Sequence, residues 1–229
     1  MTQNEAKIFL SAQRGKTELS WFRSFHSFNF GSFQDPNKEH IGKLRVLNDN
    51  TLAAGCGMKM QVEKPTEVLI LPLVGGIEFK NSVGYHDFLE AGKLQIFSAE
   101  AEKEYEVLNP YESELINYLE IWIEQENAIV ASTTSATIDL EKQNELLLIF
   151  SSVQQNAFGY FGKYDSREEG IYQIKNACNC LYVFVIEGAF EVDNKLMEAR
   201  DGLAIWNAEE IEFEALSNDA MLLIFEIPA

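Results

Sequence analysis

Short runs of apolar residues recur along the whole chain and alternate with turn residues. Clear examples are residues 68–71, 94–97, 119–123, 181–186 and 221–227, which are rich in β-branched and aromatic side chains. Glycine, asparagine, aspartate and proline separate the runs, as is typical of short strands joined by turns. This pattern predicts an all-β sandwich or barrel.

The middle of the chain departs from this pattern. Residues 138–156 mix helical and strand periodicity, so we expect a linker with a short helix in or near it, followed by the first strand of a second unit. The polar run Thr133-Thr134-Ser135 precedes this segment and marks a boundary. The sequence therefore predicts two domains, 1–133 and 134–229.

An internal repeat supports a duplicated architecture. Four blocks recur in the same order about 110 residues further along the chain. The paired blocks are 74–78 with 186–191, 92–100 with 202–209, 104–106 with 212–214, and 118–123 with 222–227. Four matches in order favour a duplicated β-sandwich over a chance similarity of alternating strands.

Each half has the strand and glycine order that resembles a cupin, the double-sheet jelly roll. The segments 21–31 and 42–49 and the tripeptide Gly55-Cys56-Gly57 resemble the opening of the pirin family, and residues 181–185 and 221–225 resemble its second cupin. The resemblance covers nearly the whole chain. It implies a bicupin of two antiparallel double-stranded β-helix (jelly-roll) barrels packed together, with the N-terminal pirin-type cupin first.

The same resemblance implies where a metal would bind. Some pirin-family members are quercetin 2,3-dioxygenases, whose first cupin holds an iron-type metal through His-x-His, a later His and a nearby Glu. In this chain those positions fall on Lys59-Met60-Gln61 and Tyr105-Glu106-Val107, and an alternative register anchored on Glu67 uses Gln61 and Glu63. Neither register supplies an imidazole. We therefore expect a degenerate metal site, with no metal and no cofactor.

The three histidines lie outside these positions. His26 belongs to a block that in the family is structural and lies at the surface, His40 lies in a predicted loop, and His86 in a predicted turn between strands. We favour loop or capping roles for all three over a role as ligand or pH switch.

A polar cluster is the candidate ligand pocket of the first barrel, and no catalytic residue is assigned. Its members are Lys59, Gln61, Glu63, Glu67 and Tyr105. If the family's geometry holds, Lys59 and Gln61 face the barrel interior with Tyr105, and an acid neutralises the lysine. Three interpretations stay open: recognition of a small organic carboxylate or phenolic ligand, a polar plug in place of the metal, or a shifted strand with Met58 and Met60 facing inward.

Charge excludes some partners. The 229 residues contain 36 acidic and 18 basic side chains, for a net charge of −18. Such an acidic protein repels nucleic-acid phosphates and anionic lipid, so we expect neither as a direct partner. No apolar run approaches the roughly 20 residues of a membrane span, and three sparse cysteines favour the reduced cytoplasm.

These features lead to one preferred function and two alternatives. The preferred function is a pirin-related bacterial protein without its metal site that binds a small molecule or acts as a regulator. The first alternative is a quercetinase-type dioxygenase with an unorthodox metal site. The second is a protein-interaction module that uses its acidic surface. Enzymatic activity is left undecided, and its absence is favoured.

Overall fold

Strands form almost the whole chain. The computed structural model describes residues 4–127, 129–152 and 156–229. Within these ranges the only helical element is the 3-10 helix η1 (Ser11–Gln13), and the strands form four antiparallel sheets. The predicted all-β fold class is confirmed. No helix in the described ranges is long and apolar enough to cross a membrane.

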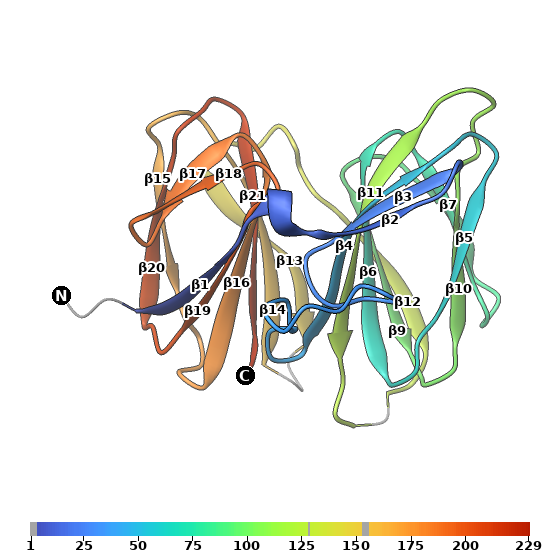
Figure 1. Cartoon of the computed structure of the whole chain (residues 1–229), viewed down its shortest axis with the longest axis horizontal. Helices are drawn as coiled ribbons and strands as arrows, with labels where there is room; N and C mark the ends of the chain where they lie inside the picture. Colours follow the sequence, from blue (N-terminus) through green and yellow to red (C-terminus); the bar gives the residue numbers. More distant parts are fainter. Residues whose placement is uncertain (1–3, 128, 153–155) are drawn as a thin grey trace. The chain divides into compact units, whose positions relative to one another are not determined.

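The chain divides into two compact units, each a jelly roll of one large and one small sheet (Figure 1). We call residues 15–137 the first barrel, and residues 1–14 with 138–229 the second barrel. The predicted boundary after residue 133 falls inside a strand of the first barrel, and the first 14 residues belong to the second barrel.

The first barrel pairs a seven-stranded sheet with a four-stranded one. In spatial order the large sheet contains β12 (Ser132–Thr137), β9 (Lys93–Ala99), β6 (Thr66–Val74), β11 (Ile116–Glu124), β4 (Leu44–Leu52), β3 (Phe22–His26) and β2 (Gly15–Glu18). The small sheet contains β5 (Gly57–Gln61), β10 (Glu104–Leu108), β7 (Ile77–Asn81) and β8 (His86–Leu89).

The second barrel repeats this topology. Its large sheet contains β1 (Glu5–Phe9), β19 (Gly202–Trp206), β16 (Asn179–Glu187), β21 (Ala220–Pro228), β14 (Ala157–Tyr164) and β13 (Glu145–Ser152). Its small sheet contains β15 (Glu169–Gln173), β20 (Glu210–Ala215), β17 (Ala189–Val192) and β18 (Lys195–Glu198). The order β5-β10-β7-β8 thus corresponds to β15-β20-β17-β18, which agrees with the repeat in the sequence.

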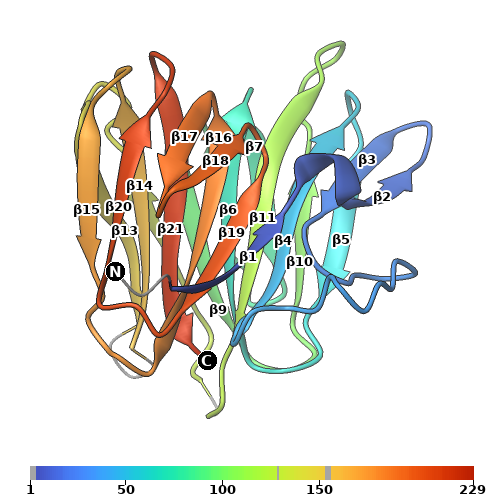
Figure 2. The ribbon, with the colours of Figure 1, turned by 60° about the vertical axis from the view of Figure 1, so that its left-hand side comes forward.

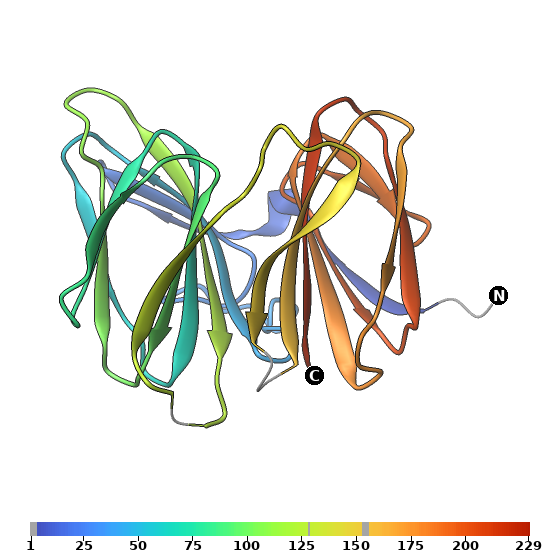
Figure 3. The ribbon, with the colours of Figure 1, turned by 180° about the vertical axis from the view of Figure 1, so that it is seen from behind.

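The N-terminal strand explains why residues 1–14 belong to the second barrel. β1 pairs with β19 along its whole length, from Glu5 opposite Trp206 to Phe9 opposite Gly202 (Figures 1 and 2). Phe9 is 1 % exposed and packs edge-on against Tyr182 at 5.7 Å. In the first barrel, β12 takes the matching edge and pairs with β9 (Figure 3).

The expected linker contains no helix among its described residues. β13 (Glu145–Ser152) confirms the first strand of a second unit, whereas residues 138–144 form turns and irregular backbone. Residues 153–155 of the predicted segment lie outside the described residues. The apolar run 146–149 within this segment belongs to a strand that pairs with β14.

Each barrel encloses its own apolar core. In the first barrel the buried cluster includes Phe79, Phe97, Tyr105 and Tyr118, and in the second it includes Phe190 and Phe213 with their neighbours. The corresponding glycines at the strand turns, Gly75 and Gly188, have φ of +74° and +76°, a left-handed conformation that side chains other than glycine's disfavour. The two predicted glycine turns therefore mark the same corner in both barrels.

Candidate functional site

Strand β5 turns its methionines, and not its lysine, toward the interior of the first barrel. Met58 and Met60 pack against the buried core, whereas Lys59 and Gln61 are exposed on the opposite face. Met60 lies opposite the buried Tyr105 in the pairing of β5 with β10. The expectation that Lys59 and Gln61 face the interior with Tyr105 is therefore wrong, and the alternative with Met58 and Met60 inward is the one observed.

The two glutamates of the predicted cluster lie apart from each other and from Lys59. Glu63 is exposed just beyond β5, and Gln61 Nε2 donates to the backbone oxygen of Glu102 at 3.1 Å. Glu67 lies on β6 next to Val68, which faces the interior, so its side chain points away from that core. There it accepts a hydrogen bond from Ser98 Oγ at 2.7 Å. Of the predicted cluster, only Tyr105 has its side chain inside the barrel.

The polar centre of the first barrel is a residue that the sequence interpretation missed, Glu120 on β11. Its carboxylate is 2 % exposed and accepts a hydrogen bond from the Tyr105 hydroxyl. Asn48 Nδ2 and Asn50 Nδ2 each donate to its other oxygen at 3.2 Å. Trp122 Nε1 in turn donates to the Tyr105 hydroxyl at 2.7 Å. We call these five residues the Glu120 network.

The Glu120 network extends sideways across the large sheet through His26. Asn48 on β4 lies opposite both Glu120 on β11 and His26 on β3. His26 Nδ1 donates to Asn48 Oδ1 at 2.8 Å, since a carbonyl oxygen only accepts, and His26 Nε2 accepts from Thr17 Oγ1 at 2.8 Å. One ladder of polar side chains therefore runs over four neighbouring strands.

The positions of the histidines correct part of the sequence interpretation. His26 is 1 % exposed and lies within β3, so it has no loop, capping or surface role. His86 opens β8 and lies 3.4 Å from Glu78, while His40 is in the predicted loop. None of the three lies on β5 or β10.

Burial governs the protonation of the Glu120 network. Loss of water raises the pKa of Glu120, although the hydrogen bonds from Tyr105, Asn48 and Asn50 oppose that rise. Burial and the neighbouring Glu120 carboxylate raise the pKa of Tyr105 well above 10. Tyr105 therefore stays protonated and donates a hydrogen bond to Glu120. Every oxygen of the carboxylate already has a protein donor.

The second barrel contains a comparable buried carboxylate. Glu226 on β21 is fully buried and accepts hydrogen bonds from Tyr172 Oη at 2.6 Å, from Asn179 Nδ2 at 2.8 Å and from two backbone amides of residues 175 and 176. In each barrel, therefore, the last long strand places one glutamate inside, where a tyrosine hydroxyl donates to it. In the sequence each is an acid between two apolar residues, a pattern that an ordinary alternating strand also shows.

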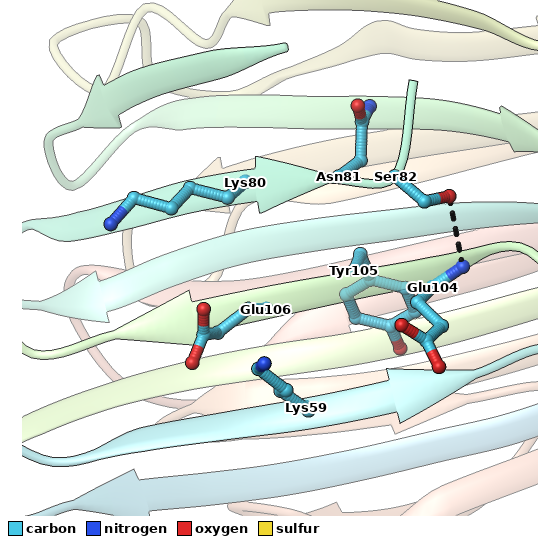
Figure 4. Close-up of a pocket in the computed structure, with 7 residues that line it drawn as sticks. All are labelled: Lys59, Lys80, Asn81, Ser82, Glu104, Tyr105 and Glu106. Atoms are coloured by element: carbon cyan, nitrogen blue, oxygen red, sulfur yellow. Dashed lines mark hydrogen bonds between the residues drawn. The ribbon is translucent and has the colours of Figure 1, made fainter. Parts of the chain in front are cut away.

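A hollow of about 170 Å³ lies on the outer face of the small sheet of the first barrel (Figure 4). Its lining residues are Lys59, Lys80, Asn81, Ser82, Glu104, Tyr105 and Glu106. Glu106 lies opposite Lys59 on one side and opposite Lys80 on the other, so the two cations flank one carboxylate. Tyr105 also lines the hollow. Its side chain is only 2 % exposed, because its hydroxyl lies inside the barrel, where it donates a hydrogen bond to Glu120.

Comparison with known proteins places this architecture in a family. The family model described as "Pirin" matches residues 9–123, and the model described as "Quercetinase C-terminal cupin domain" matches residues 150–227. The chain belongs to the pirin family. The predicted bicupin is thereby confirmed.

Several relatives match along nearly the whole pirin chain. Quercetin 2,3-dioxygenase of Escherichia coli is 29 % identical over 223 residues, which cover 94 % of this chain and 96 % of that protein. The crystal structure of YhhW from E. coli covers 98 % of both chains with 26 % identity and a TM-score of 0.89. A structure of the same bacterial pirin in complex with nickel(II) has 25 % identity, 98 % and 99 % coverage and a TM-score of 0.87.

The donor set in this barrel does not fit such a metal. The inward positions of β5 and β10 are Met58, Met60, Tyr105 and Val107, which supply thioethers, a protonated phenol and an isopropyl group. Nickel(II) and similar first-row divalent ions prefer imidazole and carboxylate. Glu120, the buried acid of the Glu120 network, has its oxygens occupied by three donors.

Proposed function

We propose that this pirin-family protein is a non-catalytic, cytoplasmic protein that binds a small organic carboxylate or phenol, in a regulatory capacity. One observation supports the proposed absence of catalysis: β5 directs Met58 and Met60 into the first barrel, opposite Val107 and Tyr105. Relatives named quercetin 2,3-dioxygenase suggest a phenolic compound as the class of ligand.

The hollow on the small sheet supports the binding part of the proposal. Lys59 and Lys80 place two ammonium groups at its walls, and Asn81 and Ser82 add neutral polar groups (Figure 4). An anionic oxygen of a carboxylate or phenolate would contact the ammonium groups of Lys59 and Lys80 above the strand surface, where Coulomb attraction counteracts repulsion by Glu106 and by the acidic chain as a whole. The carboxylates of Glu104 and Glu106 favour a ligand that also carries a hydrogen-bond donor.

Metal content and turnover test the catalytic part. The full chain is produced with nickel, iron or manganese in the medium, its metal content is measured, and quercetin consumption is followed with the E. coli quercetin 2,3-dioxygenase as positive control. We expect far less than one divalent metal per chain and no turnover. One equivalent of metal that disappears in Glu120→Gln, together with turnover, would establish the dioxygenase alternative instead.

Titration with 4-hydroxybenzoate and with quercetin tests the binding part. We expect saturable binding that weakens several-fold in Lys59→Met, because this variant keeps the aliphatic stem and removes the charge. Lys103→Met is the matched control, since Lys103 forms a 3.6 Å ion pair with Glu100 outside the hollow. Equal loss in both variants, or no saturation, contradicts binding in the hollow.

A further inference from the structure

Exposed apolar side chains gather at one corner of the first barrel, where β6 ends and the chain turns into β7. Val74, Phe88 and Leu115 there expose 59 %, 41 % and 61 % of their surfaces, and the half-buried Tyr111 lies among them. We call these four residues the apolar corner. We propose that the apolar corner docks a segment of a partner protein in which apolar side chains are flanked by lysine or arginine. None of the four lines the hollow that contains Lys59, so the two sites are separate.

Contacts around two glycines bring the four side chains together. Gly75 lies so close to Tyr111 and Ile116 that a Cβ on it would stand 3.2 Å from the tyrosine Cε2 and 3.0 Å from the isoleucine Cγ2. The amide of Gly76 donates to Tyr111 Oη at 2.8 Å, and the Phe88 ring covers Gly76 so closely that a Cβ there would overlap it. The valine of the corner precedes the first glycine and the leucine precedes Ile116, so the four side chains form one continuous patch.

The second barrel repeats this corner and serves as an internal comparison. Gly188 takes the place of the first corner glycine, with a similar φ of +76°, and lies against Ser217 and Ala220. The amide of Ala189 donates to Ser217 Oγ at 3.1 Å, as the matching amide of the first barrel does to a tyrosine hydroxyl. Ala220 opens β21 as Ile116 opens β11. The two corners therefore share one backbone arrangement.

The side chains on this shared backbone differ in polarity. Glu187 precedes the glycine of the second barrel, where the first barrel has Val74. Asp219 precedes the last long strand, where the first barrel has Leu115. Both acids are exposed. The fold therefore accepts a charged residue at either position, and the first corner does not need its apolar side chains in order to form. An exposed apolar patch that the fold does not require is typical of an interaction surface.

The charge around the apolar corner identifies the kind of partner. Glu112 and Glu114 are exposed in the loop that leads to Leu115, and residues 104–141 contain no lysine or arginine. This rim repels a second copy of the same acidic chain and attracts a cationic partner. Asn109 is 2 % exposed and its Nδ2 donates to the backbone oxygen of Glu114 at 2.8 Å, so the loop is ordered before a partner binds. An apolar centre within a polar rim matches the usual anatomy of a protein interface.

Titration with a short, fluorescently labelled amphipathic peptide of leucine and lysine tests the proposal. The anisotropy of the peptide is followed as the full chain is added at about 0.15 M salt. We expect saturable binding, which Val74→Glu/Leu115→Asp weakens by about tenfold or more, because the burial of two apolar side chains is lost. The second barrel carries these acids at the matching positions, so the double variant should stay folded. Glu112→Gln/Glu114→Gln should weaken binding several-fold and make it less dependent on salt.

A matched double variant separates the corner from general charge attraction. Ile171→Asp/Leu196→Glu adds the same two charges at exposed apolar residues of the second barrel and should not weaken binding. Absence of saturation, unchanged or tighter binding in Val74→Glu/Leu115→Asp, or an equal loss in both double variants overturns the proposal. So does a wild-type dimer in sedimentation that disappears in Val74→Glu/Leu115→Asp, because the corner then docks a second copy. None of these results affects the proposed function, which is tested at Lys59.

Discussion

The hydroxyl of Tyr105 connects Glu120 to Trp122 within the Glu120 network, and its removal is the sharpest test of that network. Tyr105→Phe deletes the donor to Glu120 and the acceptor for Trp122 Nε1. The aromatic ring stays, and with it the stacking on Phe79 at a centroid distance of 5.9 Å. The variant therefore isolates the polar contribution from the packing contribution.

The size of the effect follows from the partners. A hydrogen bond to a charged group contributes about 1.5–3 kcal/mol, and Asn48 and Asn50 still solvate the carboxylate after the change. Trp122 is half-buried, so its unpaired N–H can reach water and adds little. We expect Tyr105→Phe to lower the free energy of unfolding of the first barrel by about 2 kcal/mol at pH 8.

The loss of stability caused by Tyr105→Phe should depend on pH, and the pKa of Glu120 sets the direction of that dependence. Burial raises the pKa of Glu120 from its usual 4.5, so the folded state binds this proton more tightly than the unfolded state does. The free energy of unfolding therefore falls as pH rises from about 4.5 through the folded pKa. Tyr105 favours the carboxylate, so its loss raises that pKa further. The deficit of Tyr105→Phe should consequently be larger at pH 8 than at pH 5.

Urea unfolding at pH 5 and pH 8 measures both effects. Tryptophan fluorescence reports on the first barrel through Trp21 and Trp122 and on the second through Trp206, since two units need not unfold in one step. Tyr172→Phe is the control, because it removes the donor to Glu226 in the second barrel and should spare the first transition. A change below about 0.5 kcal/mol at pH 8, or equal deficits at both pH values, refutes the reasoning.

Three further substitutions test other parts of the structure. Burial raises the pKa of Glu67, so wild-type stability falls above pH 4.5, and Glu67→Gln should flatten that decline in urea unfolding between pH 5 and pH 8. Gly75→Ala should cost about 1–2 kcal/mol in the first barrel, because φ is +74° and the new Cβ meets Ile116 Cγ2 at 3.0 Å; thermal unfolding measures it. Phe9→Ala should lower the free energy of unfolding of the second barrel by about 3–5 kcal/mol, because Phe9 is buried and packs on Tyr182. It should leave the first barrel unchanged, and unfolding followed by the fluorescence of Trp206 measures the effect on the second.

The fold was predictable from the sequence because its signals are local. Strand periodicity and turn residues fall within a few positions of each other, and the repeat about 110 residues apart returns as two jelly rolls with the same strand order. The edge strand β1 was not predictable in this way. Its partner β19 lies nearly 200 residues away, and nothing within Glu5–Phe9 distinguishes one open sheet edge from another. The predicted first domain therefore included residues 1–14, which belong to the second barrel.

The candidate site was predictable only in part, because a shift of one residue along a strand turns every side chain to the other face of the sheet. Tyr105 was placed correctly inside the barrel, as its burial shows. Glu120 was overlooked because an acid between two apolar residues looks like an ordinary alternating strand. Only the structure reveals that both faces of Leu119-Glu120-Ile121 are buried. The donors that make this tolerable, Asn48 and Asn50, lie about 70 residues earlier in the chain.

The orientation of β5 follows from the relative costs of the two registers. With Lys59 inward, a cation would lose its water and would need an acid at bonding distance, and an unpaired buried charge costs several kcal/mol. Glu120 already accepts hydrogen bonds from Tyr105, Asn48 and Asn50, so its carboxylate is solvated without a cation. With Met58 and Met60 inward, no such cost arises and apolar surface is buried against the core. Hydrophobic burial therefore determines which face of β5 points inward, and Lys59 faces the hollow.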